Sequence, residues 1–408
     1  MEFWLPYGVT DVAVAIPDEN LLGFLAPLEG STSQGLDEII SAALVRMRDG
    51  TLFESASRAK KTVIAFNGRS IVCSSAANML GEKLVREGIQ GVELLEGAPD
   101  PTLQRSGLGS ADSHPQALCQ RTRHDARASQ VVKVGQLDDG SEILLNENFV
   151  NADIKCVVAN VAVNPFWGYS GGPNFMIPEL ASEKTVKACL SPSLRSERSP
   201  GTLAGNPMHE TLLRASQTTR VDFAIHLVER PDGKVAGAFA GDFMETFQRA
   251  CALAAKIFRP PLRRKADIVI LSAGGVPWDR SFFEASPSLV MAVNICKDQG
   301  IIILVAECSD GSGELPSAGL TGSELKARLA HARKFFSLDM LLEYSFRKVA
   351  GEHRVYLVST LPEHQASLCQ LLDAKSVKSA LERAIRHMGK DAKIALLPYG
   401  SHTAPILE

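Results

Sequence analysis

The sequence predicts an α/β protein of two domains: the C-terminal domain built on a doubly wound parallel sheet, the N-terminal domain of mixed α/β type. Three observations carry this prediction. The chain has 408 residues, more than one compact core usually holds. Short apolar runs alternate with helical patterns in its last third, and a basic stretch with two prolines, 259–265, precedes that part.

The C-terminal domain is predicted from four apolar runs rich in β-branched residues. Each run is apolar on both sides, as a strand covered by helices on both faces requires. The predicted strands are 266–272, 301–306, 355–359 and 393–397. Helices are predicted at 281–299, ended by Gly300, and at 323–336, 362–371 and 376–388.

The N-terminal domain begins with the same alternation but does not keep it. A strand at 62–66, a helix at 74–87 and a strand at 92–95 are followed by a polar stretch, 104–130, that we expect to be loop. The turn 230–234 lies between strands at 221–229 and 235–239, which makes this domain mixed, and 242–258 is its last helix. We therefore expect domains at 1–258 and 266–408 joined by the linker 259–265, with the last residues as candidates to return to the first domain.

Composition excludes several classes of protein. A net charge of -3 gives no basic surface for nucleic acid, so small molecules are the expected partners. The N-terminus lacks the pattern of a cleaved signal peptide and no run approaches the ~20 apolar residues of a membrane span, so the expected location is cytoplasmic. The eight cysteines are scattered without a C-x-x-C pair and are expected to be buried, reduced side chains.

The segment 168–172 matches the G-x-S-x-G pattern of a hydrolase nucleophile elbow. An elbow serine must be followed directly by a helix, whereas Pro173 and Pro178 interrupt the next residues and no helix is expected before about residue 182. The glycine-rich turn is then a tight bend, or a loop whose backbone N–H groups approach an anionic ligand.

Glycines also follow two predicted strands, at Gly274-Gly275 and within 307–313, where open α/β sheets bind ligands. Neither segment matches a dinucleotide or ATP fingerprint. The nine histidines form no H-x-H or H-x-x-x-H pair, so no metal ligand is predicted. His124, beside Asp125, and His209 stand out as candidate catalytic residues, the alternative being a surface or helix-capping role.

Taken in order, these segments resemble the nickel-pincer lactate racemase family across most of the chain. The resemblance lies in 16–20, 124–126, 168–172, 205–210, 237–242, 272–277, 301–309 and 398–400. It implies two α/β domains with an active site in the cleft between them, and racemisation of a 2-hydroxy acid, an isomerase activity. In the family, a pyridinium mononucleotide holds nickel in a pincer tethered to a lysine, one histidine completes the nickel coordination, and two others serve as alternating bases while a hydride moves to and from the cofactor.

Carried over residue by residue, the resemblance departs at the positions that hold this chemistry. The tether lysine falls on Asn174 and the metal-ligating histidine at or near Leu190, which makes the nickel-pincer nucleotide doubtful here. One catalytic histidine falls near Asn164, and the other near Pro99 or Asp100.

The phosphate-binding element is reduced to 67–71, which keeps Arg69, and two substrate-binding residues fall on Glu284 and Pro287. The cofactor-binding candidates are Asn67, Arg69, Ser170, Gly171, Gly172 and Asn174. The substrate-binding candidates are Asn164, Asp279 and Glu284.

Two hypotheses follow from the sequence. The first is a racemase or epimerase of a 2-hydroxy acid that holds the pincer without a covalent bond and uses other bases, with His124, His209 and Asp100 as candidates. The second is a catalytically silent homologue that binds a small carboxylate or nucleotide in the cleft between the domains. The sequence predicts neither the substrate nor the oligomeric state.

Overall fold

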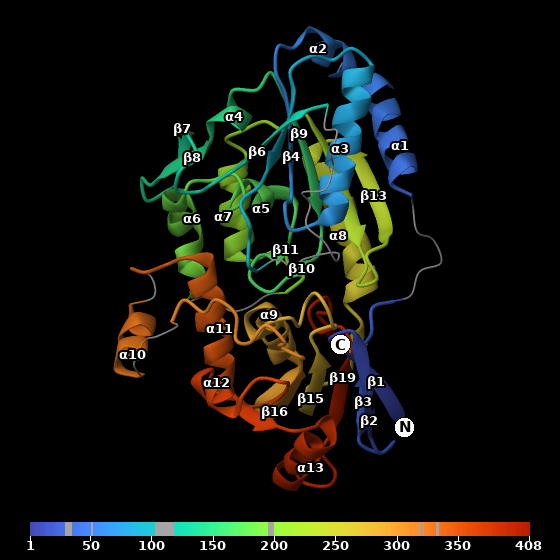
Figure 1. The fold of residues 1–408 in the computed structure, drawn as a ribbon, viewed down its shortest axis with the longest axis vertical. Helices are drawn as coiled ribbons and strands as arrows, with labels where there is room; N and C mark the ends of the chain where they lie inside the picture. Colours follow the sequence, from blue (N-terminus) through green and yellow to red (C-terminus); the bar gives the residue numbers. More distant parts are fainter. Residues whose placement is uncertain are drawn as a thin grey trace. The chain divides into compact units, whose positions relative to one another are not determined.

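A computed structural model describes residues 1–28, 35–49, 52–102, 118–194, 200–317, 320, 322–331 and 334–408 (Figure 1). The chain forms two compact units. Unit 1 comprises Met1–Glu29, Leu194–Gly201 and Lys256–Glu408, and unit 2 comprises Gly30–Ser193 and Thr202–Ala255. No helix in the described part of the chain is both long and apolar enough to span a bilayer.

Unit 1 is built on a six-stranded, fully parallel sheet with the order β18-β17-β16-β15-β19-β3. Its strands are β3 (Leu21–Phe24), β15 (Ala266–Ser272), β16 (Cys296–Val305), β17 (Arg354–Val358), β18 (Leu372–Ala374) and β19 (Ile394–Leu397). Their apolar residues and the helices on both faces confirm the predicted doubly wound architecture.

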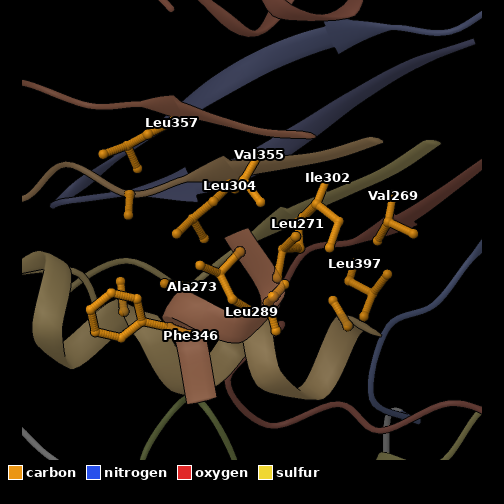
Figure 2. Close-up of a cluster of buried hydrophobic side chains, with 14 of the residues drawn as sticks. Val269, Leu271, Ala273, Leu289, Ile302, Leu304, Phe346, Val355, Leu357 and Leu397 are labelled. Atoms are coloured by element: carbon orange, nitrogen blue, oxygen red, sulfur yellow. The ribbon is translucent and has the colours of Figure 1, made fainter. Parts of the chain in front are cut away.

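The helices α9 (Phe282–Ala292), α11 (Leu338–Glu352) and α12 (Glu363–Leu368) cover one face of this sheet. Figure 2 shows the core between them, where Leu289 and Phe346 meet strand residues such as Leu304. The opposite face is covered by α13 (Val377–Met388) and by the hairpin of β1 (Glu2–Tyr7) and β2 (Thr10–Ala15). A further helix, α10, spans Gly322–Ala330.

The first 29 residues fold with unit 1, although the sequence analysis placed them in the N-terminal domain. β3 extends the sheet by pairing with β19, and buried Leu5, Val14 and Ile16 of the hairpin region pack beneath it. The expected linker also belongs to this unit, because β14 (Pro261–Leu262) pairs with β20 (Ile406–Leu407) at the end of the chain.

The helix expected at 281–299 is wrong in its second half. α9 ends at Ala292, a 3₁₀ turn spans Val293–Ile295, and β16 begins at Cys296, which pairs with Ala266. Gly300 does not end a helix: it lies in β16 where the pairing with β15 shifts register, and a Cβ there would lie 2.6 Å from Cys296 Sγ.

Unit 2 has a six-stranded mixed sheet with the order β13-β12-β9-β4-β5-β6, in which only the β12–β13 pair is antiparallel. Its strands are β4 (Thr62–Phe66), β5 (Val92–Glu96), β6 (Gln120–Arg123), β9 (Ile154–Asn160), β12 (Phe223–Glu229) and β13 (Val235–Gly241). The stretch expected to be loop at 104–130 therefore contributes β6, because its polar residues suit an edge strand. Its residues 104–117 lie outside the described chain.

One face of this sheet is covered by α1 (Leu36–Asp49) and α3 (Ile71–Arg86), with α2 (Leu52–Arg58) beside them (Figure 1). The remaining helices of the unit are α4 (Glu147–Val150), α5 (Gly172–Met176), α6 (Glu183–Leu190) and α7 (Pro207–Ser216). The 3₁₀ turn Ser191–Leu194 and α8 (Phe243–Phe258) begin in unit 2 and end in unit 1. Two hairpins, β7 (Val131–Gln136) to β8 (Glu142–Asn146) and β10 (Val163–Asn164) to β11 (Gly168–Tyr169), complete the unit.

Candidate functional site

Polar side chains gather at the carboxyl ends of the parallel strands in unit 2, the edge at which open α/β sheets place ligands. Asn67 follows β4, and its amide is fully engaged: Nδ2 donates to Glu179 Oε1 at 2.9 Å, and Oδ1 accepts from the backbone N of Arg69 at 3.0 Å. Burial raises the pKa of Glu179 well above its ordinary value, and negative charge at Asp100 adds to the effect, against the opposing influence of Asn67 and Arg69.

The next group of side chains surrounds the start of α3. Ser70 caps this helix by accepting a hydrogen bond from the backbone N of Cys73 at 2.9 Å, and its hydroxyl donates to Glu229 Oε1 at the end of β12. Burial, followed by the negative charge of Glu229, raises the pKa of the Cys73 thiol, so this cysteine is not an activated nucleophile.

Asn164 and Asp100, near which the resemblance places catalytic histidines, lie in one hydrogen-bonded chain. Asp100 Oδ1 accepts from both the backbone N of Thr102, at 2.9 Å, and its hydroxyl, at 2.7 Å. Asn164 Nδ2 donates to the same hydroxyl at 3.2 Å, and all three residues are buried. Thr102 is thus a residue of this cluster that the sequence analysis missed.

The glycine-rich turn joins β11 to a short helix, α5, that begins at Gly172. The expectation of no helix before residue 182 is therefore wrong, because Pro173 occupies the first turn, where its missing N–H costs nothing. Gly171 and Gly172 have φ values of 76° and 47°, and a Cβ on Gly172 would lie 2.5 Å from the Phe247 ring. Glycine is required here by both conformation and space.

Ser170 does not act as an elbow nucleophile in this arrangement. Its Oγ donates to Asn160 O at 2.9 Å and accepts from Ala162 N at 2.8 Å, so the hydroxyl closes the turn onto the end of β9. No histidine contacts this hydroxyl within the described residues. The bend interpretation of the motif accounts for these bonds without a catalytic role.

Asn174 and Leu190 are both buried. Asn174 lies in α5 with 4% of its surface exposed, and its Oδ1 has no hydrogen-bond partner in the described chain. Leu190 ends α6 and is fully buried. The described residues contain no group of three or more His, Cys, Asp or Glu that could hold a metal ion.

His124 has a structural role. Its Nε2 lies 3.0 Å from Ala181 O and its Nδ1 3.0 Å from Asn146 Nδ2, so the ring donates through one nitrogen and accepts through the other. Burial lowers its pKa, which keeps it neutral. Asp125 is exposed and accepts hydrogen bonds from the backbone N–H groups of Arg127 and Ala128, which lower its pKa.

His209 lies at the start of α7, where Asn206 caps the helix, and its ring stacks on Phe247 at 6.3 Å. Burial lowers its pKa. A second histidine, His226, contacts the same phenylalanine at 5.8 Å. The sequence analysis missed it, although a polar residue inside the apolar strand β12 was a signal.

His226 fixes the glycine-rich turn. Its Nε2 accepts from the backbone N of Gly172 at 3.2 Å, and its Nδ1 lies 2.8 Å from Thr246 Oγ1, which itself donates to Asp242 O. The accepting Nε2 places the proton on Nδ1. Complete burial lowers the pKa of His226 to about 3, so the ring is neutral.

The remaining candidates lie in unit 1. Asp279 follows β15 and is fully buried, with Oδ2 accepting from Gly8 N at 2.7 Å and from Glu307 N at 3.1 Å. It ties together the loops at the ends of β1, β15 and β16. Glu284 lies in the first turn of α9, where its N–H is capped by Ser281, and Pro287 lies inside the same helix.

Two α/β units, each with polar residues at the carboxyl ends of parallel strands, define the class: a two-domain α/β protein. Family models identify it further. The lactate racemase C-terminal domain matches residues 262–403, and the lactate racemase N-terminal domain matches residues 114–199. Together they span more than half of the chain, which belongs to the lactate racemase family.

Individual relatives also support the assignment to the lactate racemase family. A lactate racemase of Thermoanaerobacterium thermosaccharolyticum is 24% identical over 415 residues, 97% of each chain, and one of Lactiplantibacillus plantarum is 28% identical over 285 residues, 67% of this chain and 66% of the relative. The lactate racemase apoprotein structure from T. thermosaccharolyticum matches the fold with a TM-score of 0.82 at 23% identity, covering both chains fully. A Thermotoga maritima crystal structure matches with a TM-score of 0.64 at 16% identity, covering 93% of this chain and all of that one.

Proposed function

We propose that this protein is a lactate racemase-like isomerase that racemises or epimerises a small 2-hydroxy acid, in the cytoplasm. The observation that carries the proposal is the similarity to a lactate racemase over 97% of both chains, with family models matching in both halves. The polar strand ends of unit 2 supply hydrogen-bonding groups that suit a hydroxyl and a carboxylate.

The residues present do not fit a covalently tethered nickel-pincer nucleotide. Asn174, at the position inferred for the tether, carries an amide that cannot form the lysine linkage, and the buried Leu190 side chain offers a metal no ligand atom.

Two groups of this chain are candidates to handle the proton of a substrate hydroxyl. Asp100 is a carboxyl group held in one orientation by Thr102, and the pair lies beside Asn164, whose amide adds a fixed polar group. His209 is buried with its pKa lowered, so at neutral pH its ring accepts a proton. His124 is a poor base because both of its nitrogens bond to the fold.

The departures at Asn174 and Leu190 favour a second candidate function, a homologue that binds a small carboxylate without turnover. Such a protein keeps its ligand-binding edge and loses the groups that complete a reaction. Ligands would raise its melting temperature, because they bind the folded state only.

One preparation decides between these functions. The protein is purified from a host that makes the pincer cofactor, bound nickel is measured by elemental analysis, and mass is compared under native and denaturing conditions. The purified protein is then incubated with single enantiomers of several 2-hydroxy acids, followed by chiral chromatography, with Asp100→Asn and His209→Gln as variants. Appearance of the opposite enantiomer, reduced ~10²–10⁴-fold in a variant that removes a base, supports the isomerase. Ligand-dependent stabilisation without any conversion supports the silent homologue and refutes the isomerase.

A further inference from the structure

We infer that a cavity in unit 2 binds an uncharged, polyhydroxylated small molecule, a sugar or a polyol. The cavity has a volume of about 470 Å³, within the range of small-molecule sites, and lies over β5 and β6 beside α4 (Figure 1). All twelve lining residues belong to unit 2, and none of them is a catalytic, cofactor-binding or substrate-binding candidate named above. The inference therefore concerns a second site and does not depend on racemase activity.

Two neighbouring strands form the floor of the cavity. In the parallel pairing of β5 with β6, Glu93 lies opposite Gln120. Two residues further along, Leu95 lies opposite Thr122. Side chains two positions apart in a strand point to the same face of the sheet, so these four share one face. Leu94, which points to the other face, packs in the core against α3. The cavity therefore occupies the face of β5 and β6 opposite α3.

The lining is polar and rich in amide groups. Eleven of the twelve residues are polar or charged, and Leu95 is the exception. Five carry a side-chain amide, and three of these amides, in Gln120, Gln130 and Asn151, form no hydrogen bond within the described residues. An amide places a donor beside an acceptor, and each hydroxyl of a sugar or polyol also donates and accepts. The three amides therefore suit a ligand with several hydroxyl groups.

The two cations of the lining are already engaged by the protein. The Lys61 ammonium donates to the Asn148 amide oxygen and lies 3.6 Å from Glu93 Oε2. The Asn148 Nδ2 donates to the same Glu93 oxygen at 2.8 Å, which closes the group. Arg123 forms an ion pair with Glu96 at 2.6 Å. A carboxylate or phosphate ligand would have to break these contacts to gain a cation of its own, so the cavity disfavours an anion.

Glu147 supplies a carboxylate that can accept from ligand hydroxyl groups. It is the first residue of α4, and its backbone N–H donates to Gln130 O at 2.9 Å, which joins two segments of the cavity wall. Its side chain forms no hydrogen bond or ion pair within the described residues. The lining holds two acids and two cations, so its formal charge is zero, which suits an uncharged ligand better than a cation.

The test compares ligands of similar size that differ in charge. The uncharged probes are D-glucose, D-galactose, D-ribose and myo-inositol, and the charged probes are glucosamine and glucuronate. Binding to the full-length protein is measured by saturation-transfer NMR and isothermal titration. At least one uncharged probe is expected to bind with a Kd below ~10 mM, and more tightly than either charged probe.

Two variants locate the binding. Glu147→Ala is expected to weaken it roughly tenfold, the size of one hydrogen bond to a charged group, and Gln120→Ala about threefold. Neither side chain bonds to another described residue, so the melting temperature should change little. Glu363→Ala is the matched control, because Glu363 is likewise the first residue of a short helix, α12, and lies in unit 1. It should leave the affinity unchanged.

Three results would overturn the inference. The first is that no uncharged probe binds with a Kd below ~10 mM. The second is tighter binding of glucosamine or glucuronate than of every uncharged probe, which would mean that the cavity recognises charge. The third is binding that neither variant weakens, because the ligand would then lie elsewhere. If Glu147→Ala does not fold, Gln120→Ala decides alone. Sugar binding by a protein that racemises no hydroxy acid would refute only the proposed function.

Discussion

The side-chain amide of Asn164 donates a hydrogen bond to the hydroxyl of Thr102 across 3.2 Å. The two residues are 62 positions apart in sequence, and the bond brings Asn164 to the same small network as Asp100. The network connects the ends of β5 and β9, two strands separated in the sheet by β4. Its integrity can be tested apart from any reaction.

Thr102→Val should destabilise the protein by about 1–3 kcal/mol, because the buried carboxyl of Asp100 loses one donor and the amide of Asn164 loses its acceptor, while the side-chain shape is kept. Urea unfolding measures the change. Thr211→Val is the control, since that hydroxyl forms only an exposed bond to the backbone of its own helix. Equal stability of the two variants would show that the network contributes nothing.

Ser170→Ala should cost about 1–3 kcal/mol and leave any ester hydrolysis unchanged, because the hydroxyl holds backbone groups of β9 and the following loop and has no catalytic partner. Urea unfolding gives the stability change. Treatment of the native protein with a fluorophosphonate, followed by peptide mass spectrometry, tests the chemistry. A stoichiometric adduct on Ser170 would contradict the structural role and revive the nucleophile-elbow interpretation.

His226→Gln should make the protein less sensitive to acid. The pKa of His226 is lowered from 6.5 to about 3 by burial, so below pH 6.5 the unfolded chain takes up a proton that the folded chain refuses. Stability linked to this residue is therefore complete above pH 6.5 and is lost as the pH falls from 6.5 towards 3. Glutamine can bond to Gly172 and Thr246 without titrating.

The measurement is the free energy of unfolding of wild type and variant at intervals between pH 7 and pH 4. The two curves should approach each other as the pH falls. His364→Gln, at an exposed position in α12, is the control and should leave the slope unchanged. Parallel curves for wild type and His226→Gln would mean that the ring is not neutral in the folded protein.

Local signals predicted the elements that depend on local interactions. α13 begins with a capping box between Ser376 and Ser379 and has buried apolar residues on one face, so its helix was visible in sequence. The start of β16 could not be predicted from the sequence, because Cys296 becomes a strand residue only by pairing with Ala266, 30 positions earlier. The same reason hides the attachment of β3 to β19 at the far end of the chain.

In the candidate site, too, the sequence indicated individual residues but not the contacts that depend on the fold. The resemblance drew attention to Asn67, Asn164 and Asn174, and the structure shows each of them buried in unit 2. The resemblance could not reveal their hydrogen-bond partners, since Glu179 and Thr102 belong to segments with no motif of their own. Nor could the resemblance show that both nitrogens of His124 are engaged, because that depends on the Asn146 side chain at the end of β8 and on the backbone carbonyl of Ala181 before α6.

The double variant Asn174→Lys, Leu190→His should lose stability and gain no covalently attached nucleotide. Both positions are buried, at 4% and 0% exposure, so a lysine amine and an imidazole would be taken out of water without a partner, at a cost of several kcal/mol. The variant is expressed in a host that makes the pincer cofactor, then examined by intact mass under denaturing conditions and by urea unfolding.

Leu190→Ala, expected to cost about 2–5 kcal/mol through the cavity alone, separates loss of packing from burial of polar groups. A mass increase equal to one mononucleotide would show that these two substitutions suffice to attach the cofactor, and would refute the prediction.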